Sequence, residues 1–509
     1  MGTVYIDGEN LTLEDVEEVA LRGARVELSP QVETRVNLCR GFVEGIVKRE
    51  EVVYGITTGF GKLCQVRIEG NQIGKLQENL IKSHSAGVGR HLSIPETRGM
   101  MLLRANLLSK GHSGVRLELI QTLAEILNRG IHPLVPEKGS VGASGDLAPL
   151  AHIGLVMIGL GKAEYQGKIL DGKVAMERAG IGLLTLEAKE GLALINGTQF
   201  MSSIGTLSLL KALRLCKVAD IAGAMTLEGA LATPTAFDQS FQQVRGYRGQ
   251  KESADNLRRL VQESQIVEYH KDCGKVQDPY SIRCMPQVHG ATREALRSVR
   301  SVLEVEINSA TDNPLIFPQE GKVISGGNFH GQPVSIFLDL MGIAASALGN
   351  ISERRIALLM NENESGLPPF LSLESGLHSG FMIAQVTAAS LVSENKILAH
   401  PASVDSIPTS ANQEDHVSMG GIAARKAREI IDNVEYILAI ELLASAQAID
   451  LRAPLKPGRG TGEAWRLIRA KVPKLNQDRI LAEDIEIVKE LIEEGEMVRG
   501  VEEKIGRLN

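Results

Sequence analysis

Residues 200–230, FMSSIGTLSLLKALRLCKVADIAGAMTLEGA, are rich in leucine and alanine and contain no proline. Leucine and alanine lose little conformational freedom in a helix, whereas proline interrupts one. The stretch therefore predicts one long helix, and it is one of three stretches that decide the fold class.

Two later stretches carry apolar residues at spacings of three and four, the pattern of one buried helical face. The first ends at the stop signal TDNP, residues 311–314, and the second ends before the breaker-rich APLKPGRGTG, residues 453–462. The apolar positions are Leu296, Val299, Leu303, Ile307 and Ala310, and then Ile431, Val434, Leu438, Leu442 and Ile449. Both patterns predict long helices.

β-branched residues alternate only in short pieces, at residues 4–6 and 322–324. Aromatic residues make up 4% of the chain, so the core has to be aliphatic. We therefore expect a mainly α fold, with a helical bundle behind a more irregular N-terminal part. The 52 glycines gather in the first 200 residues and around residues 321–331, where we expect loops and functional sites.

A chain of 509 residues is too long for one small domain, and its 43% hydrophobic and 23% charged residues are typical of globular proteins. The net charge of −7 does not favour nucleic acid or an anionic membrane as a partner. The first residues carry acids and do not resemble a targeting leader. The uncharged run 191–210 is too polar for a membrane span, so we expect it to be buried protein interior.

Five cysteines are scattered along the chain without a CxxC pair: Cys39, Cys64, Cys216, Cys273 and Cys284. This pattern favours neither a disulfide framework nor a zinc site. It is typical of a protein of the reducing cytoplasm, and each cysteine is expected to act as a small packed hydrophobe.

The run GSVGASGDLAPL, residues 139–150, reads in isolation as a turn before a helix with Asp146 as the N-cap. As a whole it resembles the signature of the aromatic amino acid ammonia-lyase family, which includes histidine, phenylalanine and tyrosine lyases and related aminomutases. The resemblance implies that Ala143, Ser144 and Gly145 cyclise and lose water to form a methylidene-imidazolone (MIO) prosthetic group. It also implies that Asp146 and Asn196 contact this group.

The residue types of the triad suit that chemistry. Gly145 offers the least hindered backbone nitrogen to attack the carbonyl of Ala143, which itself adds little bulk. Ser144 supplies the side chain whose dehydration leaves an exocyclic methylidene. A helix that begins at Asp146 would direct its positive N-terminal end toward the new ring.

The run YGITTGFG begins at Tyr54, which in isolation reads as a packing residue before a glycine-rich loop. The resemblance implies that Tyr54 is a catalytic base on a loop over the active site. At its ordinary pKa of ~10, a tyrosine is only ~0.1% ionised at pH 7. An effective base needs that pKa lowered by ~2–3 units.

Two further segments match the family. Asn196-Gly197 reads alone as a turn, and the resemblance makes Asn196 a hydrogen-bond partner of the prosthetic group and the substrate. In QDPYSIRC, residues 277–284, the resemblance assigns Arg283 to the substrate carboxylate, for which a guanidinium is suited, and places Gln277 and Tyr280 in the same site. Out of context, Arg283 would be a surface or ion-paired arginine.

Substrate choice depends on two other positions. His84 reads alone as a helix-end histidine, and Glu414 in NQEDH, residues 412–416, as part of a solvated acidic helix start. The resemblance places both residues in the substrate pocket and makes Glu414 a catalytic residue as well. The motif around Glu414 is similar to the version found in histidine lyases. Phenylalanine lyases typically carry glutamine at the position of Glu414 and an apolar residue at the position of His84. Phe329, alone a core aromatic, would face the reacting group.

The resemblance thus implies elimination of ammonia from L-histidine to give trans-urocanate, with tyrosine or phenylalanine ammonia-lyase or aminomutase activity as the alternative. It implies a helical bundle of the aspartase/fumarase type and a homotetramer with shared active sites. We expect an N-terminal domain over residues 1–205 that carries the triad and a helical bundle with a C-terminal helical region over residues 206–509. The expected partner is a small-molecule substrate, an amino acid, with no metal, nucleic acid or membrane.

Overall fold

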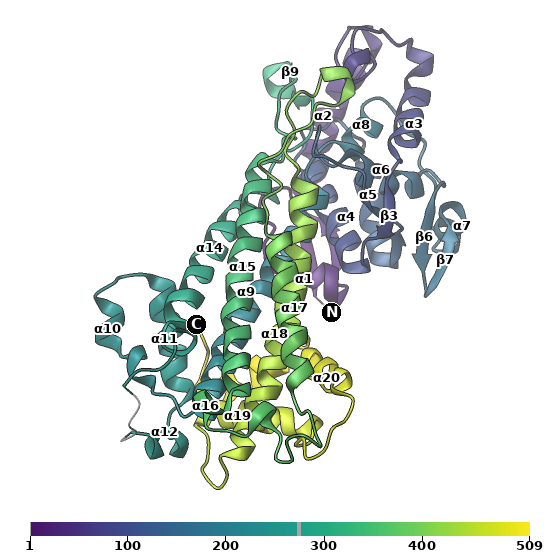
Figure 1. The fold of residues 1–509 in the computed structure, drawn as a ribbon. Helices are drawn as coiled ribbons and strands as arrows, with labels where there is room; N and C mark the ends of the chain where they lie inside the picture. Colours follow the sequence, from purple (N-terminus) through teal and green to yellow (C-terminus); the bar gives the residue numbers. More distant parts are fainter. Residues whose placement is uncertain (1, 272–275) are drawn as a thin grey trace. The chain divides into compact units, whose positions relative to one another are not determined.

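The computed structural model describes residues 2–271 and 276–509, so Cys273 lies outside the described residues. Within them the fold is mainly α, which confirms the predicted class (Figure 1). The chain forms two compact units. Unit 1 contains residues 1–207, 300–339 and 401–425, and unit 2 contains residues 208–299, 340–400 and 426–509.

All described strands belong to unit 1, where they form small sheets beside the helices. Strands β1 and β2 pair in parallel, whereas β3–β5, β4–β6–β7 and β8–β9 pair antiparallel. The strands are β1 (Thr3–Ile6), β2 (Arg25–Leu28), β3 (Val88–His91), β4 (Ile131–Pro133), β5 (Pro136–Lys138), β6 (Lys162–Tyr165), β7 (Lys168–Asp171), β8 (Leu315–Phe317) and β9 (Lys322–Ile324). The helices wholly within unit 1 are α1 (Leu13–Arg22), α2 (Pro30–Lys48), α3 (Ile73–His84), α4 (Ile94–Ser109), α5 (Leu117–Arg129), α6 (Leu147–Met157), α7 (Gly172–Arg178) and α8 (Glu190–Ile195).

Four long helices have residues in both units and are prominent in Figure 1: α9 (Gln199–Gly229), α14 (Met285–Glu306), α15 (Gln332–Met360) and α18 (Gly420–Leu451). The three helices predicted from the sequence are α9, α14 and α18, and they are confirmed. Helix α14 ends at Glu306, so Ile307 and Ala310 of the apolar stripe lie beyond it. The helices wholly within unit 2 are α10 (Gln239–Gln243), α11 (Arg248–Leu260), α12 (Gln265–Tyr269), α13 (Tyr280–Arg283), α16 (Glu362–Ser365), α17 (Met382–Leu398), α19 (Arg459–Lys471), α20 (Leu481–Glu493) and α21 (Glu496–Ile505).

Small residues allow the long helices to pack closely in unit 2. A Cβ atom on Gly229 of α9 would lie 2.6 Å from the Cβ of Ala448 in α18. The buried interior also holds an ion pair, in which Arg355 of α15 donates to both carboxylate oxygens of Glu441 in α18, at 2.5 and 2.8 Å. A paired and hydrogen-bonded carboxylate of this kind is compatible with an otherwise apolar core.

The run 191–210 is almost entirely buried, as expected from its sequence. Among the described residues, one helix, α15, is long and apolar enough to cross a membrane, by length and composition alone. In this structure 67% of its most apolar window is buried, and the core helix of a folded protein meets the same criterion. Cys39, Cys64, Cys216 and Cys284 are free thiols.

Candidate active site

A cavity of about 460 Å³ in unit 1 brings together five residues that separate sequence motifs had singled out. These are Tyr54, His84, Ser144, Asn196 and Glu414. They come from the loop after α2, the end of α3, the triad before α6, the residue after α8 and the segment before α18. The remaining lining residues are Gly59, Phe60, Gly61, Lys62, Leu63, Leu76, Asn79, Leu80, Ser83, Leu147, Leu192, Ile195 and Ser410.

The backbone of the triad is left-handed at Ser144 and Gly145. Ser144 has a φ of +53°, a left-handed conformation that costs a residue with a Cβ about 1 kcal/mol or more. Gly145 has a φ of +80° and pairs with Gly197, so that a Cβ on Gly145 would lie 2.2 Å from the Gly197 carbonyl oxygen. The Asp146 amide donates to that same oxygen at 2.7 Å. Only glycine therefore fits at position 145.

Asp146 occupies the N-cap position of α6, but its side chain makes no capping bond to that helix. Its carboxyl group instead accepts from the Met201 amide at 3.0 Å and from the Ser140 hydroxyl at 3.3 Å. Met201 lies in the first turn of α9, so Asp146 fastens the triad to the start of a long helix. Burial raises the pKa of the Asp146 carboxyl to about 7.

Asn196, near the triad, has a buried polar atom without a hydrogen-bond partner among the described residues. Its side chain is 4% exposed, and within the described structure its Oδ1 atom has no hydrogen-bond partner. An unpaired buried amide oxygen is unfavourable unless a ligand or another polar group completes it. The amide NH2 of the same side chain can donate to a carbonyl oxygen, so Asn196, together with the glycine contact at position 145, fits a polar group built from residues 143–145 and leaves Oδ1 for a ligand that donates.

Glu414 is held by three hydroxyl groups. The Ser144 hydroxyl donates to Oε1 at 3.1 Å, whereas Thr409 and Ser410 donate to Oε2 at 2.8 and 2.7 Å. Both oxygens of this carboxyl group therefore act as hydrogen-bond acceptors.

The hydrogen bonds of His84 define its tautomer in the neutral form. Its Nδ1 atom lies 2.9 Å from the carbonyl oxygen of Leu80, which can only accept, so Nδ1 carries the proton and Nε2 presents a lone pair. Burial lowers the pKa of His84, while the nearby Glu414 and the bond to Leu80 oppose that shift. His84 and Glu414 are therefore both acceptors in the cavity.

Tyr54 is the phenol of the cavity, and its hydroxyl accepts from the Gly61 amide at 3.4 Å. Burial raises the pKa of Tyr54, and the charge of Glu414 acts in the same direction. This is opposite to the lowering that a base requires. Its loop is closely packed, because a Cβ on Gly55 would lie 2.7 Å from Leu192 and 3.0 Å from Pro314.

The chain matches the family model of aromatic amino acid lyases over residues 11–470. The chain belongs to the aromatic amino acid lyase family. It is 54% identical to the histidine ammonia-lyase of Myxococcus xanthus, with 98% of each chain covered. It resembles the crystal structure of histidine ammonia-lyase from Trypanosoma cruzi at 44% identity and a TM-score of 0.92, with 99% of this chain and 96% of that one covered. It also resembles the tyrosine aminomutase from Streptomyces globisporus at 38% identity and a TM-score of 0.94, with both chains fully covered.

Besides Ala143, Gly145 and Asp146, which adjoin the lining residue Ser144, four predicted site residues of this lyase do not line the cavity. Gln277, Tyr280 and Arg283 belong to unit 2, whereas Phe329 is half-buried in unit 1, between β9 and α15. The Arg283 guanidinium lies 4.4 Å from the ring centre of Tyr280, which is 70% exposed. Arg283 also donates to the Asp278 carbonyl at 3.1 Å. Their assignment to the active site remains a prediction.

The sequence interpretation missed several lining residues. Leu76, Leu80 and His84 follow one another at a spacing of four on α3, with Asn79 and Ser83 beside them. This spacing marks one helical face and was a readable signal. Ser410 gave no such signal, because it lies in an irregular segment.

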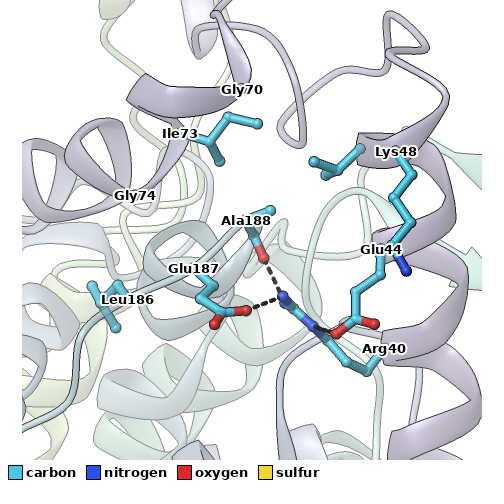
Figure 2. Close-up of a pocket in the computed structure, with 10 residues that line it drawn as sticks. Arg40, Glu44, Lys48, Gly70, Ile73, Gly74, Leu186, Glu187 and Ala188 are labelled. Atoms are coloured by element: carbon cyan, nitrogen blue, oxygen red, sulfur yellow. Dashed lines mark hydrogen bonds and ion pairs between the residues drawn. The ribbon is translucent and has the colours of Figure 1, made fainter.

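A second cavity of about 340 Å³ lies next to the segment that leads into α8. Figure 2 shows the Arg40 side chain of α2 bonded to Glu44, to Glu187 and to the carbonyl of Ala188, the last at 3.0 Å. The guanidinium of Arg40 thus has hydrogen-bond acceptors within the protein itself. It ties α2 to the residues that precede α8, and α8 ends at the site residue Asn196.

Proposed function

We propose that this protein eliminates ammonia from L-histidine to give trans-urocanate. The observation that supports it best is one cavity that contains Ser144 of the triad together with His84 and Glu414. The high identity to histidine ammonia-lyases over nearly the whole chain supports the same substrate. The first experiment incubates the protein separately with L-histidine, L-tyrosine and L-phenylalanine and follows the unsaturated acid.

The proposed prosthetic group is an MIO formed from Ala143, Ser144 and Gly145. When present, this group supplies an electrophile, which none of the ordinary side chains in the cavity provides. The unpartnered Oδ1 atom of Asn196 would accept a hydrogen bond from the substrate, while its amide NH2 would donate to the carbonyl oxygen of the group. Asp146 would hold the group next to the start of α9. The left-handed backbone at Ser144 and Gly145 supports a cyclisation that requires residues 143 and 145 to approach each other.

Tyr54 is proposed to accept the substrate proton. In the structure its phenol is neutral, since burial raises its pKa. A cation beside the phenol would reverse that shift, and an amino acid substrate brings one in its ammonium group. Arg283 is proposed to bind the substrate carboxylate, with Gln277 and Tyr280 in the same site and Phe329 facing the reacting carbon.

Glu414 and His84 are proposed to select the imidazole ring. Both present acceptor atoms. A neutral imidazole donates to one of them and an imidazolium donates to both, whereas a phenyl ring leaves both unpaired. Glu414 is also proposed to take part in proton movement during the reaction.

Tyrosine or phenylalanine lyase or aminomutase activity is the second candidate. The overall fold does not separate the two, because the TM-score to a tyrosine aminomutase equals or exceeds that to a histidine ammonia-lyase. The three-substrate assay decides between them. A preference for tyrosine or phenylalanine would reject histidine as the substrate, and a β-amino acid product would indicate an aminomutase.

The protein is further proposed to act as a cytoplasmic homotetramer. The long apolar helices support an assembly around a shared bundle, and the absence of any CxxC pair in the sequence supports a reducing compartment. Sedimentation of active protein tests the assembly, and a fully active monomer would reject it.

A further inference from the structure

The segment that carries Glu414 forms a closed loop. The Thr409 amide donates to the Glu414 carbonyl at 2.9 Å, and the Glu414 amide donates back to the Thr409 carbonyl at 3.3 Å. Between them, Ser410, Ala411 and Asn412 all have left-handed backbones, with φ values of 50°, 53° and 65°. Three consecutive non-glycine residues in this region are unusual, because each Cβ disfavours it. The loop geometry is therefore imposed by the contacts around it.

The side chains of the loop act on one oxygen of Glu414. Thr409 and Ser410 both donate to Oε2, at 2.8 and 2.7 Å, while Oε1 is the atom that faces Ser144 at 3.1 Å. With Oε2 occupied by two donors, the carboxylate cannot rotate without losing both bonds. Its other oxygen is thereby directed at the triad.

We propose that Thr409 and Ser410 are positioning residues that orient Glu414 for the reaction. This inference rests on the catalytic and selective role proposed above for Glu414. Thr409 provides the cleaner test of the two, because Ser410 lines the cavity and Thr409 does not. Thr409 is thus expected to act on the substrate only through Glu414.

The experiment is a double-mutant cycle of Thr409→Val and Glu414→Ala, with kcat/KM for L-histidine as the measured quantity. Valine keeps the shape of threonine and removes the hydroxyl. A hydrogen bond to a charged group is worth enough to change kcat/KM about tenfold. We expect about a tenfold loss from Thr409→Val when Glu414 is present and less than about a twofold loss when it is absent. Thr409→Ser, which retains the hydroxyl, should restore most of the activity.

Ser406→Ala is the matched control, since this hydroxyl lies in the same segment and accepts from the Val417 amide at 3.0 Å without contacting Glu414. Its effect should be equal in both backgrounds. Should Thr409→Val fail to fold, Thr409→Ala, which also removes the hydroxyl, enters the same cycle with the same expectation.

An equal loss from Thr409→Val in both backgrounds, or no loss in either, would overturn the positioning role. A separate outcome concerns the proposed function itself. If Glu414→Ala alone retains full turnover of histidine, the role of Glu414 is wrong and the positioning role falls with it. A large effect of Glu414→Ala without one of Thr409→Val rejects the positioning role alone.

Discussion

The guanidinium of Arg104 donates to the carbonyl oxygen of Asn196 at 2.7 Å, and to that of Ala193 at 3.0 Å. Both carbonyls lie at the C-terminal end of α8, where the last carbonyl groups of a helix have no N–H donor within the helix. Arg104 supplies donors to them. At the other end, the buried ammonium of Lys189 donates to Asp312 at 2.7 Å. Buried cations therefore fix both ends of the helix that sets the position of Asn196.

Arg104→Met should therefore impair both stability and catalysis. Arg104 is 1% exposed, so its removal leaves buried carbonyls without donors and should lower the free energy of unfolding by about 2–4 kcal/mol. The displacement of Asn196 should appear mainly in kcat. Thermal unfolding and steady-state kinetics measure the two effects. Arg22→Met, which removes only an exposed ion pair with Glu18, is the control and should change stability by less than about 1 kcal/mol.

Ser144→Ala should fold but lack the prosthetic group, because no side-chain oxygen remains to be eliminated. Intact-mass measurement should find this variant at its full calculated mass. The unaltered protein should be lighter by two water molecules, one lost from the Ala143 carbonyl on ring closure and one from the Ser144 side chain. Activity should fall by orders of magnitude. Ser109→Ala is the control, because this buried hydroxyl donates to the carbonyl of Ala105 within its own helix, α4. Near-normal turnover by Ser144→Ala would reject the assignment of the group.

Tyr54→Phe keeps the packing of the ring and removes the phenolic oxygen. If Tyr54 is the base, kcat should fall by about 10²-fold or more, with a smaller change in KM. Steady-state kinetics should therefore show a large fall in kcat and a smaller change in KM. A raised KM at constant kcat would make Tyr54 a binding residue.

Selectivity should change when both acceptors of the cavity are altered. Glu414→Gln combined with His84→Leu should depress kcat/KM for histidine strongly, by as much as ~10⁴-fold, and allow weak activity on phenylalanine. The single Glu414→Gln change should also lower kcat if Glu414 moves a proton. Retained preference for histidine in the double variant would contradict the proposed roles.

Stability in unit 2 should depend on pH through Glu228, which accepts from the Gly458 amide at 2.8 Å. Burial raises the pKa of this carboxyl from 4.5 to about 7. The folded state thus holds the proton more tightly than the unfolded state, and stability falls as the pH rises from 4.5 to 7, by about 3 kcal/mol from this group. Glu228→Gln should remove that contribution.

As the pH rises from about 5 to about 8, roughly the span of the titration, the thermal unfolding midpoint of Glu228→Gln should therefore increase relative to that of the unaltered protein. The exposed Glu503, changed to glutamine in the same way, is the control. A constant difference between Glu228→Gln and the unaltered protein across this range would contradict the prediction.

The sequence predicted what local patterns encode. Proline-free and periodic stretches identified α9, α14 and α18, and separate motifs identified the five residues that meet in the cavity. The early end of α14 at Glu306 was not readable, because the apolar stripe continues into the following turn. The domain boundary expected at residue 205 remains a prediction.

The missed features depend on contacts between distant residues. Asp146 holds the N-cap position of α6, yet its side chain bonds to the first turn of α9, which no local pattern encodes. Arg104 lies in the apolar helix α4, where a cation has no sequence signature of its own. Its partners become evident only when residues 193–199 are brought beside it.

The contact between Gly145 and Gly197 has a consequence for protein engineering. Two glycines far apart in the sequence touch so closely that neither tolerates a side chain, as a Cβ on Gly197 would itself lie 2.8 Å from the Arg104 guanidinium. A transplanted Ala-Ser-Gly tripeptide would lack this opposing backbone in another scaffold. A design that uses the triad therefore has to include residues 195–199 and Arg104 as well, because the backbone of that segment packs directly against the tripeptide.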